Sequence, residues 1–354
     1  DFYACSTEQG IFYNKIAILH GKDCLASTIW QNCCYWNTAF QCAFCAIGVS
    51  LANQQTIVRK SPGQLAEVAQ KAESLDSLKH IVLTTGTGNP PEKEILHLIK
   101  CTRAIKEKST LPVHVQFAPF GDLSLLQDLK DSGVDTVGIH IESLDRQVLE
   151  KVAPCKASIG FKKYETTWQE AVKIFGPNQV SSFLIAGLGE KPQTIISGSE
   201  ILADLGVYPF VVPLRPVRGS VLENSQPPCP AYMTNIYEEV AEILSKKNLS
   251  AQNCRAGCVR CSACSALDLY EEPAAGLICH SARTLAELNE VYAIRREVFV
   301  QEQGIFQGSD KDEYDEYSIH LVVKSRQGII GTVRVFPELD KKGDWIGSRL
   351  AVRK

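Results

Sequence analysis

Residues 33 to 45 read CCYWNTAFQCAFC and contain four of the chain's fourteen cysteines. Cys34, Cys42 and Cys45 are separated by seven and by two residues, and the shorter gap lets one tight loop direct two sulfurs at one centre. Soft thiolate ligands from one short segment suit an iron–sulfur cluster or zinc. A set of three leaves one metal position for a ligand that is not protein, and Cys33 can take the place of Cys34. The same cysteines also fit a site without metal, as small buried hydrophobes.

The residues after this loop alternate between predicted strands and helices. Ser61 and Gln64 form a predicted capping box at a helix start, with Pro62 at the first helical position. The predicted strands are residues 25–30, 80–85, 113–118, 136–143, 180–188 and 208–214, and the predicted helices are 62–75, 92–108, 123–133, 146–152, 166–176, 193–205 and 231–247. Such alternation implies parallel strands with right-handed crossovers. We therefore expect an α/β fold with ligands bound at the carboxyl ends of the strands.

Phe44 precedes the last cysteine of the loop, and the loop follows the first predicted strand. A three-cysteine loop of this kind near the start of a β/α chain resembles the radical S-adenosylmethionine (SAM) enzymes. The resemblance implies a partial (β/α)6 TIM-like barrel and a [4Fe–4S] cluster on Cys34, Cys42 and Cys45, with the amino and carboxylate groups of SAM on the fourth iron. It also implies an electron donor such as flavodoxin or ferredoxin. The first spacing, seven residues, departs from the three that are usual in that superfamily.

The ends of four later strands carry residues that resemble the SAM contacts of this family. Residues 84–88 (TTGTG) are similar to the glycine-rich segment facing the SAM amino group, residues 183–190 (FLIAGLGE) to the adenine support of biotin synthase-like members, and residues 211–216 (VVPLRP) to a backbone contact with adenine. The positions that the resemblance implies for SAM are Phe44, Thr85, Gly86, Glu142, Ser143, Ile185, Gly187, Val212 and Arg215. The glycine segment also fits a plain turn, and Arg215 either binds a substrate carboxylate or phosphate or pairs with Glu190.

A second group of cysteines follows the last predicted barrel helix. Cys254, Cys258, Cys261 and Cys264 are separated by three, two and two residues. No strand precedes them, so we do not assign the SAM-binding cluster to this group. The crowded spacing favours an auxiliary iron–sulfur cluster with four protein ligands, and structural zinc is the alternative. Cys5 and Cys24 stand alone in the sequence and are expected to be structural.

Composition and charge exclude several classes of protein. The 354 residues carry a formal net charge of −3, and this lack of a basic surplus argues against a nucleic-acid partner. No run of 18 apolar residues exists that could span a bilayer, so we expect no membrane partner. Clustered cysteines in a chain this long indicate metal ligation in a reducing compartment, for which we expect the cytoplasm. Because the chain begins at Asp1 and stops in mid-pattern at Lys354, we expect a piece of a longer protein.

The last part of the chain resembles the GNAT acetyltransferases. Residues 292–304 (YAIRREVFVQEQG) are similar to their first helix, and a capping box at Thr284 precedes them. The other predicted features are a linker at 270–275, strands at 276–282, 318–324 and 328–336, an acidic loop at 310–317, and the start of the central acetyl-CoA-binding strand at 345–353. The pyrophosphate-binding turn would lie beyond Lys354, so acetyl-CoA binding is expected only of the full-length protein. An accessory domain without transferase activity is the alternative.

These observations predict four parts. They are an N-terminal segment at 1–24, a radical SAM partial barrel at 25–250, a cysteine-rich auxiliary metal-site segment at 251–269 and an incomplete GNAT-like α+β domain at 270–354. The predicted function is SAM cleavage and radical chemistry on an unidentified small-molecule substrate. The combination is similar to the radical SAM group encoded beside nitrilases in bacterial gene clusters. The alternatives are an Elongator-like tRNA-modifying enzyme, which also joins these two domain types, and a non-catalytic iron–sulfur or zinc-binding protein.

Overall fold

The computed structural model describes residues 2–21, 23–271, 277–325, 328–338 and 344–353. The chain forms two compact units, Asp1–Glu271 and Glu272–Lys354, and each is described by itself. Most of the predicted linker at 270–275 lies outside the described residues, and residues 270 and 271 belong to a short helix of the first unit.

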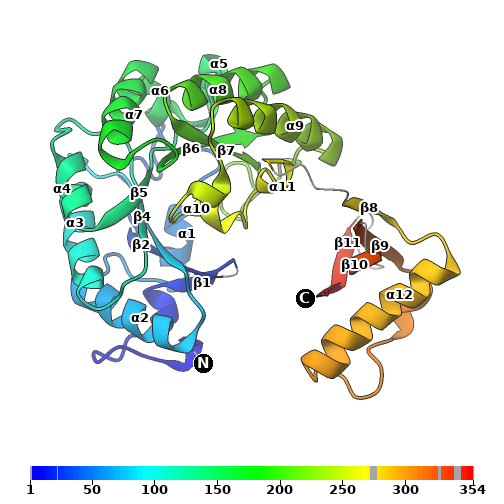
Figure 1. The fold of residues 1–354 in the computed structure, drawn as a ribbon. Coiled ribbons are helices and arrows are strands. Elements are labelled where there is room, and N and C mark those ends of the chain that lie inside the picture. Colours follow the sequence, from blue (N-terminus) through cyan, green and yellow to red (C-terminus); the bar gives the residue numbers. More distant parts are fainter. Residues whose placement is uncertain (1, 22, 272–276, 326–327, 339–343, 354) are drawn as a thin grey trace. The chain divides into compact units, whose positions relative to one another are not determined.

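The first unit is built on a seven-stranded sheet whose spatial order follows the sequence. The strands are β1 (Ile18–His20), β2 (Cys24–Trp30), β3 (His80–Thr85), β4 (Val113–Gln116), β5 (Val134–Gly138), β6 (Val180–Ala186) and β7 (Val207–Pro213). The edge strand β1 is antiparallel to β2, and every later neighbour pairs in parallel. The sheet curls into a half-barrel with helices along its outer side (Figure 1). The predicted partial (β/α)6 barrel is therefore confirmed, with one additional antiparallel strand at its edge.

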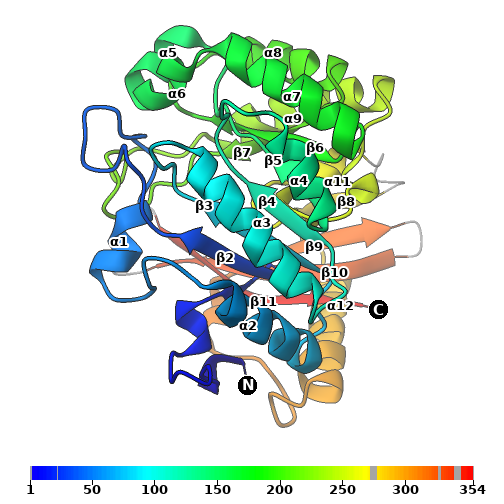
Figure 2. The same cartoon turned by 90° about the vertical axis from the view of Figure 1, so that its left-hand side faces the viewer.

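Helices cover the convex side of this sheet (Figure 2). The helices described in the first unit are α1 (Ile47–Ala52), α2 (Pro62–Leu75), α3 (Glu92–Lys106), α4 (Leu125–Asp131), α5 (Arg146–Val152), α6 (Pro154–Ile159), α7 (Phe161–Phe175), α8 (Pro192–Asp204), α9 (Pro230–Lys246), α10 (Cys258–Cys261) and α11 (Asp268–Glu271). Of these, α10 lies on the concave side (Figure 1). Single 3-10 turns lie at Phe2–Ala4, Tyr13–Lys15 and Ala251–Asn253. The capping box of α2 is present, because the Ser61 side chain accepts from the Gln64 backbone while Gln64 binds back to the Ser61 N–H.

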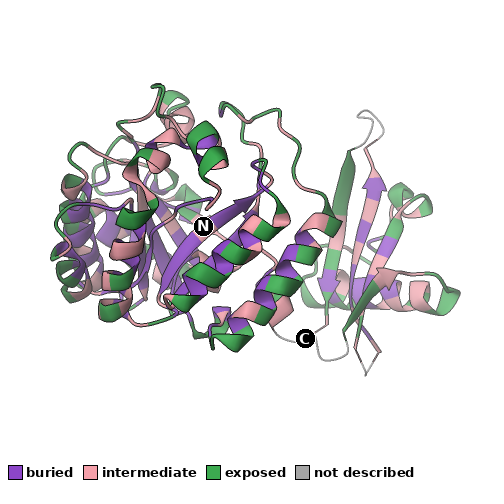
Figure 3. Ribbon diagram, turned by 90° about the horizontal axis from the view of Figure 1, so that it is seen from above, coloured by how far each residue is buried: buried purple, intermediate pink, exposed green. Residues whose placement is uncertain are grey.

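The core lies between the strands and the inward faces of the helices, where buried residues are concentrated (Figure 3). Trp168 on α7 is fully buried, and its indole N–H donates to the Ile139 carbonyl at 2.9 Å. That bond satisfies a carbonyl just beyond the end of β5. Burying a large apolar side chain contributes about 1.5–3 kcal/mol, so α7 is held firmly beside this strand end.

Three local predictions differ from the structure. The strand predicted at 136–143 ends at Gly138, because the Ile141 N–H donates to the Ser182 hydroxyl instead of continuing the ladder. The helix predicted to begin near residue 166 begins at Phe161, and α6 precedes it with Pro154 at its first turn. The sequence reasoning also missed α1, whose six residues are too few for a periodic pattern.

The second unit contains a four-stranded antiparallel sheet in the order β11-β10-β9-β8. Its elements are β8 (Ile278–Ser281), α12 (Leu285–Arg295), a π-helical extension (Arg296–Glu302), a 3-10 turn (Glu313–Glu316), β9 (Ile319–Ser325), β10 (Gly328–Pro337) and β11 (Trp345–Val352). The capping box predicted at Thr284 is present with Glu287. Buried side chains of α12 and the sheet form a small separate core.

Candidate functional site

The cysteine loop lies at the carboxyl end of β2 and packs against the turn that follows β3. The Cys34 N–H donates to the Thr87 carbonyl at 2.7 Å, and the Gly86 N–H donates to the Trp30 carbonyl at 2.9 Å. A Cβ atom on Gly86 would lie 2.0 Å from the Asn32 carbonyl oxygen. Only glycine therefore permits this approach, which brings the glycine turn and the cysteine loop together at one end of the parallel strands.

The thiols of the loop do not share one environment. Burial is the main cause that raises the pKa of Cys45 to about 11, and the nearby Cys42 and Cys33 thiols raise it further. Cys34 points elsewhere: its Sγ lies 3.6 Å from the Gly88 carbonyl oxygen, and burial followed by the charge of Cys33 raises its pKa. Cys34 and Cys45 thus differ in their surroundings, and the charge of Cys33 acts on both of them.

A further thiol, which the sequence reasoning did not single out, lies against the loop. The Sγ atoms of Cys42 and Cys155 are 3.3 Å apart, and Cys155 lies in the first turn of α6. No local spacing relates these cysteines, so only the fold brings them together. The hydrogen bond between them raises the pKa of Cys42 and lowers that of Cys155.

The thiols of the loop and of Cys155 are chemically suited to bind a metal. The structure does not arrange them as a complete set of ligands around one centre. Across the described ranges, no three His, Cys, Asp or Glu side chains are placed so that they could hold one metal ion together. The loop nevertheless supplies thiols, which are the ligands that iron–sulfur clusters use. Phe44 packs against the hydrophobic core beside them, which shields this side of the loop from water.

Glu142, at the end of the β5 segment, combines three unusual features. Its φ is +75°, a conformation that is rare and strained for a residue other than glycine, and only 7% of its surface is exposed. Its backbone forms an isolated bridge with Leu184 on β6. One carboxylate oxygen accepts from the Lys156 ammonium at 2.8 Å, and the other is buried without a hydrogen-bond partner. A buried oxygen left in this state is unfavourable unless a ligand donor reaches it.

Lys156 connects this carboxylate to the cysteine pair, because it directly follows Cys155. Its ammonium also donates to the His140 carbonyl at 2.5 Å. Burial alone would lower the pKa of Lys156, but the Glu142 carboxylate outweighs this effect and raises it. Lys156 therefore stays charged, and it places a positive charge beside the Cys42 thiol.

The remaining predicted strand-end residues lie at β5, β6 and β7. Ser143 is buried, and its hydroxyl accepts from the Asp145 N–H at 3.1 Å. Ile185 and Val212 are buried partners in the β6–β7 ladder. Gly187 has φ +100°, and its N–H donates to the Glu190 carboxylate at 2.7 Å.

Arg215 turns toward the second cysteine segment. Its guanidinium lies 3.4 Å from the Ala263 carbonyl oxygen and 3.8 Å from the Cys264 Sγ. Glu190 is occupied by the backbone N–H groups of Gly187 and Leu188 and by the Tyr232 hydroxyl. The contacts of Arg215 in the described structure are thus with the cysteine segment rather than with Glu190.

The second cysteine segment lies on the concave side of the sheet, where α10 is enclosed by the arc of strands (Figure 1). The Gln116 amide donates to the Cys258 Sγ at 3.1 Å, and the Cys264 Sγ lies 3.8 Å from His20 Nε2. Burial raises the pKa of Cys254 to about 11 and that of Cys258 to about 12. Two neighbouring cysteines, Cys261 and Cys264, raise the pKa of Cys258 further, so these thiols share one environment.

Cys24 belongs to this second group, although it stands alone in the sequence, far from the other four cysteines. A hydrogen bond with Cys24 is the main cause that lowers the pKa of Cys261 to about 4, and His80 contributes in the same direction. Both Cys24 and His80 begin strands and point to the concave side. The fold thereby adds a fifth thiol and an imidazole to the four clustered cysteines.

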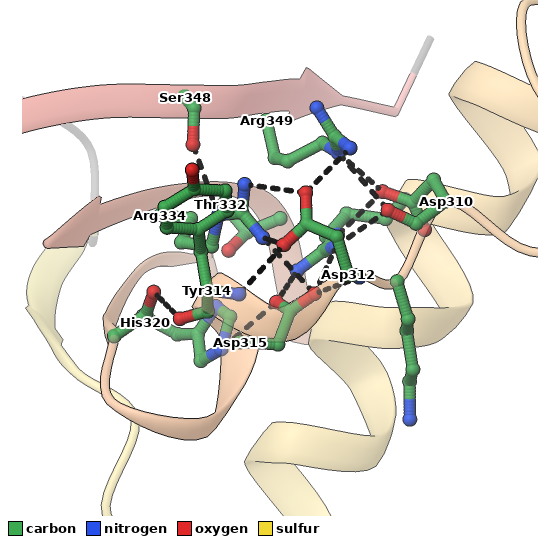
Figure 4. Close-up of polar contacts among 12 residues, drawn as sticks. Asp310, Asp312, Tyr314, Asp315, His320, Thr332, Arg334, Ser348 and Arg349 are labelled. Atoms are coloured by element: carbon green, nitrogen blue, oxygen red, sulfur yellow. Dashed lines mark hydrogen bonds and ion pairs between the residues drawn. The ribbon is translucent and has the colours of Figure 1, made fainter.

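The acidic loop of the second unit forms a buried ion-pair network (Figure 4). Arg295 on α12 is fully buried and pairs with Asp310 at 2.7 Å and with Asp315 at 2.5 Å. Arg334 on β10 and Arg349 on β11 bind Asp312 at 2.5 and 2.9 Å. Burial would raise the pKa of Asp315, but the Arg295 hydrogen bonds hold it well below its usual range. These contacts attach the loop to both the helix and the sheet.

No helix among the residues that the structure describes is long and apolar enough to cross a membrane.

Solved structures and curated proteins resemble the first unit over part of their length. Methylornithine synthase aligns with 64% of this chain and 64% of its own at 15% identity and a TM-score of 0.49. A radical SAM methyltransferase from Sphaerobacter thermophilus aligns with 66% of each chain at 14% identity and a TM-score of 0.49. Bacteriochlorophyllide c C-7(1)-hydroxylase of Chlorobaculum limnaeum is 24% identical over 59% of this chain and 57% of its own length. Biotin synthase of Clostridium acetobutylicum is 26% identical over 60% of this chain and 63% of its own.

The chain thus spans about three fifths of the length of these curated relatives. Two family models match it in separate places. The model described as radical SAM superfamily matches residues 29–197, and the model described as acetyltransferase (GNAT) domain matches residues 294–349. The first match includes the cysteine loop, the glycine turn and Glu142, and the second begins at the end of α12 and includes the acidic loop. The chain is therefore similar to the radical SAM superfamily over residues 29–197 of its first unit and to the GNAT acetyltransferases over residues 294–349 of its second.

Proposed function

We propose that the first unit cleaves SAM at a [4Fe–4S] cluster held by the 33–45 loop and starts radical chemistry on a small molecule. When bound, the cluster and SAM supply a 5′-deoxyadenosyl radical that abstracts hydrogen, which is chemistry of the cofactors rather than of the protein. The observation that carries the proposal is the meeting of the cysteine loop, the Gly86 turn and Glu142 at one end of the parallel strands. Ligands of α/β barrels bind at this end.

The residues of the chain position and shield the cofactor. The Gly86 turn lets a ligand approach the backbone closely, and the free oxygen of Glu142 can accept a hydrogen bond from an ammonium or a hydroxyl group. Lys156 holds the other oxygen at 2.8 Å, which fixes the direction of the carboxylate. Phe44 and the core behind it exclude water from the loop.

The test is anaerobic reconstitution followed by an assay for 5′-deoxyadenosine after reduction. Cys42→Ala and Cys45→Ala should each abolish its formation, because each removes a proposed ligand. Cys33→Ala and Cys34→Ala form the matched pair that assigns the third ligand, and one of them should retain activity. The charge of Cys33 acts on both Cys34 and Cys45, so this pair of variants decides which of the two cysteines is the third ligand. Unchanged activity in all four variants would refute the ligand assignment.

Flavodoxin or ferredoxin is the proposed electron donor, and it can be tested by replacing the chemical reductant in the same assay. Glu142→Gln keeps the shape of the side chain and removes its charge. We expect this variant to retain the cluster, seen in the visible spectrum, and to bind SAM at least about tenfold more weakly. Asp131→Asn, an exposed change on α4, is the control and should bind SAM normally.

We further propose an auxiliary iron–sulfur cluster on Cys254, Cys258, Cys261 and Cys264, with zinc as the alternative. The electrostatic influence of Cys254, Cys261 and Cys264 on Cys258, together with the lowered pKa of Cys261, supports a thiolate site. Iron, sulfide and zinc analysis of Cys258→Ala and Cys261→Ala, compared with Cys279→Ala in the second unit, distinguishes the two metals. Loss of two to four irons per chain supports the cluster, loss of one zinc supports the alternative, and no loss refutes both.

The GNAT-type match favours acyl transfer as a second function of the full-length protein. Acetyl-CoA binding by a protein that carries the complete domain is the corresponding test. Isothermal titration that detects no binding would favour the accessory role for this unit.

A further inference from the structure

A cavity of about 570 Å³ opens beside the inner faces of β2 and β3. Its volume falls within the range of about 300–1,000 Å³ that is typical of small-molecule sites. Ala26 and Thr28 on β2 line it together with Val82 and Thr84 on β3. Side chains two residues apart on a strand point to the same face, so these four residues belong to one face of the sheet.

That face is the concave side of the half-barrel. Cys24 and His80 lie two residues before Ala26 and Val82, and both contact Cys261 of the segment that the sheet encloses. Farther along the same strands, Gln31 and Thr84 line the end of the cavity nearest the cysteine loop. The cavity therefore follows the inner faces of β2 and β3, and Ser27 and residues 14–18 line it at the edge of the sheet. None of its described lining residues belongs to the second cysteine segment or to the 33–45 loop.

Lys60 contributes a buried cation to this cavity. Its side chain is 1% exposed, and its ammonium donates to the Thr56 hydroxyl at 2.5 Å and to the Ile57 carbonyl at 3.1 Å. Burial alone lowers its pKa to about 8, and within the described part of the chain no carboxylate compensates its charge. A buried ammonium without an anion costs several kcal/mol, so a bound anion would offset an existing penalty.

The other lining residues favour a polar anionic ligand. Lys15 supplies a second cation, and none of the described lining residues is an aspartate or glutamate. The uncharged hydrogen-bonding groups are those of Tyr3, Asn14, Ser27, Thr28, Gln31, Ser50, Gln54, Gln55, Thr56 and Thr84. Arginine and the N-terminus of a helix, the usual means of binding phosphate, are absent from this described lining. A carboxylate suits one buried ammonium better than a doubly charged phosphate does.

The cavity is also distinct from the positions implied for SAM. Those positions lie in the cysteine loop, in the turn after β3 and at the ends of β5, β6 and β7, and none of them lines the cavity in the described structure. Its walls come from β2, β3, the N-terminal segment and the stretch from α1 to Lys60. It thus lies beside the proposed cofactor rather than under it.

We propose that this cavity is the substrate chamber and that it takes a small, polar carboxylic acid whose carboxylate binds Lys60. The inference rests on the proposed radical SAM function in so far as it calls the bound acid a substrate. Binding of the acid itself needs neither cluster reduction nor SAM cleavage. The position of the chamber inside the barrel would place the remainder of such a molecule toward the cysteine loop.

The test compares glutarate with its uncharged analogue glutaramide on the anaerobically reconstituted chain, with S-adenosylhomocysteine present to fill the SAM site. At equal ionic strength, glutarate should raise the melting temperature by about 2–4 °C more than glutaramide at concentrations near ten times the Kd. Lys60→Met should remove this difference, and the exposed control Lys71→Met should retain it. Ala26→Leu fills the cavity and leaves Lys60 in place, so it should also remove the difference.

Equal effects of glutarate and glutaramide on the wild-type protein would overturn the proposal, whatever the variants do. A preference that persists in both Lys60→Met and Ala26→Leu would overturn it as well. A loss of S-adenosylhomocysteine affinity of about tenfold in Lys60→Met would instead assign Lys60 to the methionine carboxylate of SAM and exclude a separate chamber. If the preference for glutarate holds but no 5′-deoxyadenosine forms, the carboxylate site stands and the proposed enzymatic function fails.

Discussion

The Sγ atoms of Cys42 and Cys155 lie 3.3 Å apart although 113 residues separate them in the sequence. This contact matters because the proposed chemistry requires one iron to be free of protein ligands. Cys155 is the described thiol nearest to Cys42, and it could occupy that position. If Cys155 binds that iron, the cluster is coordinated by four thiolates. If it does not, the iron is free to bind SAM.

Cys155→Ala tests this choice directly. If SAM takes the fourth iron, the variant should keep its cluster and form 5′-deoxyadenosine within about threefold of the wild-type rate. Cys42→Ala is the matched change of the other member of the pair and should lose the activity. Loss of the cluster in Cys155→Ala, seen by iron analysis, would identify Cys155 as a ligand and contradict a SAM-binding iron.

Lys156→Met should destabilise the first unit strongly. The substitution leaves the Glu142 carboxylate buried without its cation, and breaking a buried pair in this way costs about 3–5 kcal/mol. Urea unfolding measures the change. Because the double variant Glu142→Gln/Lys156→Met removes both charges, it should recover most of the lost stability. A single variant as stable as the wild-type protein would mean that the pair contributes little, and Lys173→Met at an exposed pair is the control.

Gly86→Ala should impair both the folding of the loop and SAM binding. The added Cβ would lie 2.0 Å from the Asn32 carbonyl oxygen, so either the cysteine loop or the turn after β3 must move. Gly63→Ala is the matched control, because its Cβ would meet nothing within 4 Å and it lies in the first turn of α2. We expect this control to gain up to about 1 kcal/mol of stability. Equal SAM affinity of the two variants, measured by equilibrium dialysis, would show that the close approach is not required.

The elements that follow local rules could be predicted from the sequence. The bounds of β3 and α5 agree with the prediction, and both predicted capping boxes are present, because N-caps and apolar periodicity act within a few residues. The strand after α4 was predicted too long, since residues 139–142 (IHIE) continue the alternating pattern of a strand but bond to β6 irregularly. No local pattern indicates such a departure.

The same distinction between local patterns and long-range packing applies to the candidate site. Cysteine spacing and the glycine turn made the loop recognisable, because one short segment carries the proposed ligands. Cys155 and Lys156 reach the loop from elsewhere, and Cys24 reaches the second cysteine group. No local spacing relates these residues to the segments that they contact. Lys60 likewise looks like an ordinary charged residue until the fold buries it. The packing of distant segments determines such neighbours, and a single sequence does not encode that packing in any local motif.

Lys60 should make the stability of the protein depend on pH in the alkaline range. Its pKa is about 8 in the folded chain against 10.5 as the ordinary value. The folded state therefore disfavours the proton, so stability should be lowest below pH 8, where Lys60 is charged in both states, and should rise as pH increases toward 10.5. A shift of this size corresponds to about 3 kcal/mol. Lys15 and Tyr3 line the same cavity, so Lys60→Met, which should remove the rise, isolates the contribution of this lysine. Urea unfolding at pH 7.5, 9 and 10 measures it, and an equal slope in the wild-type protein and in Lys60→Met would mean that another group is responsible.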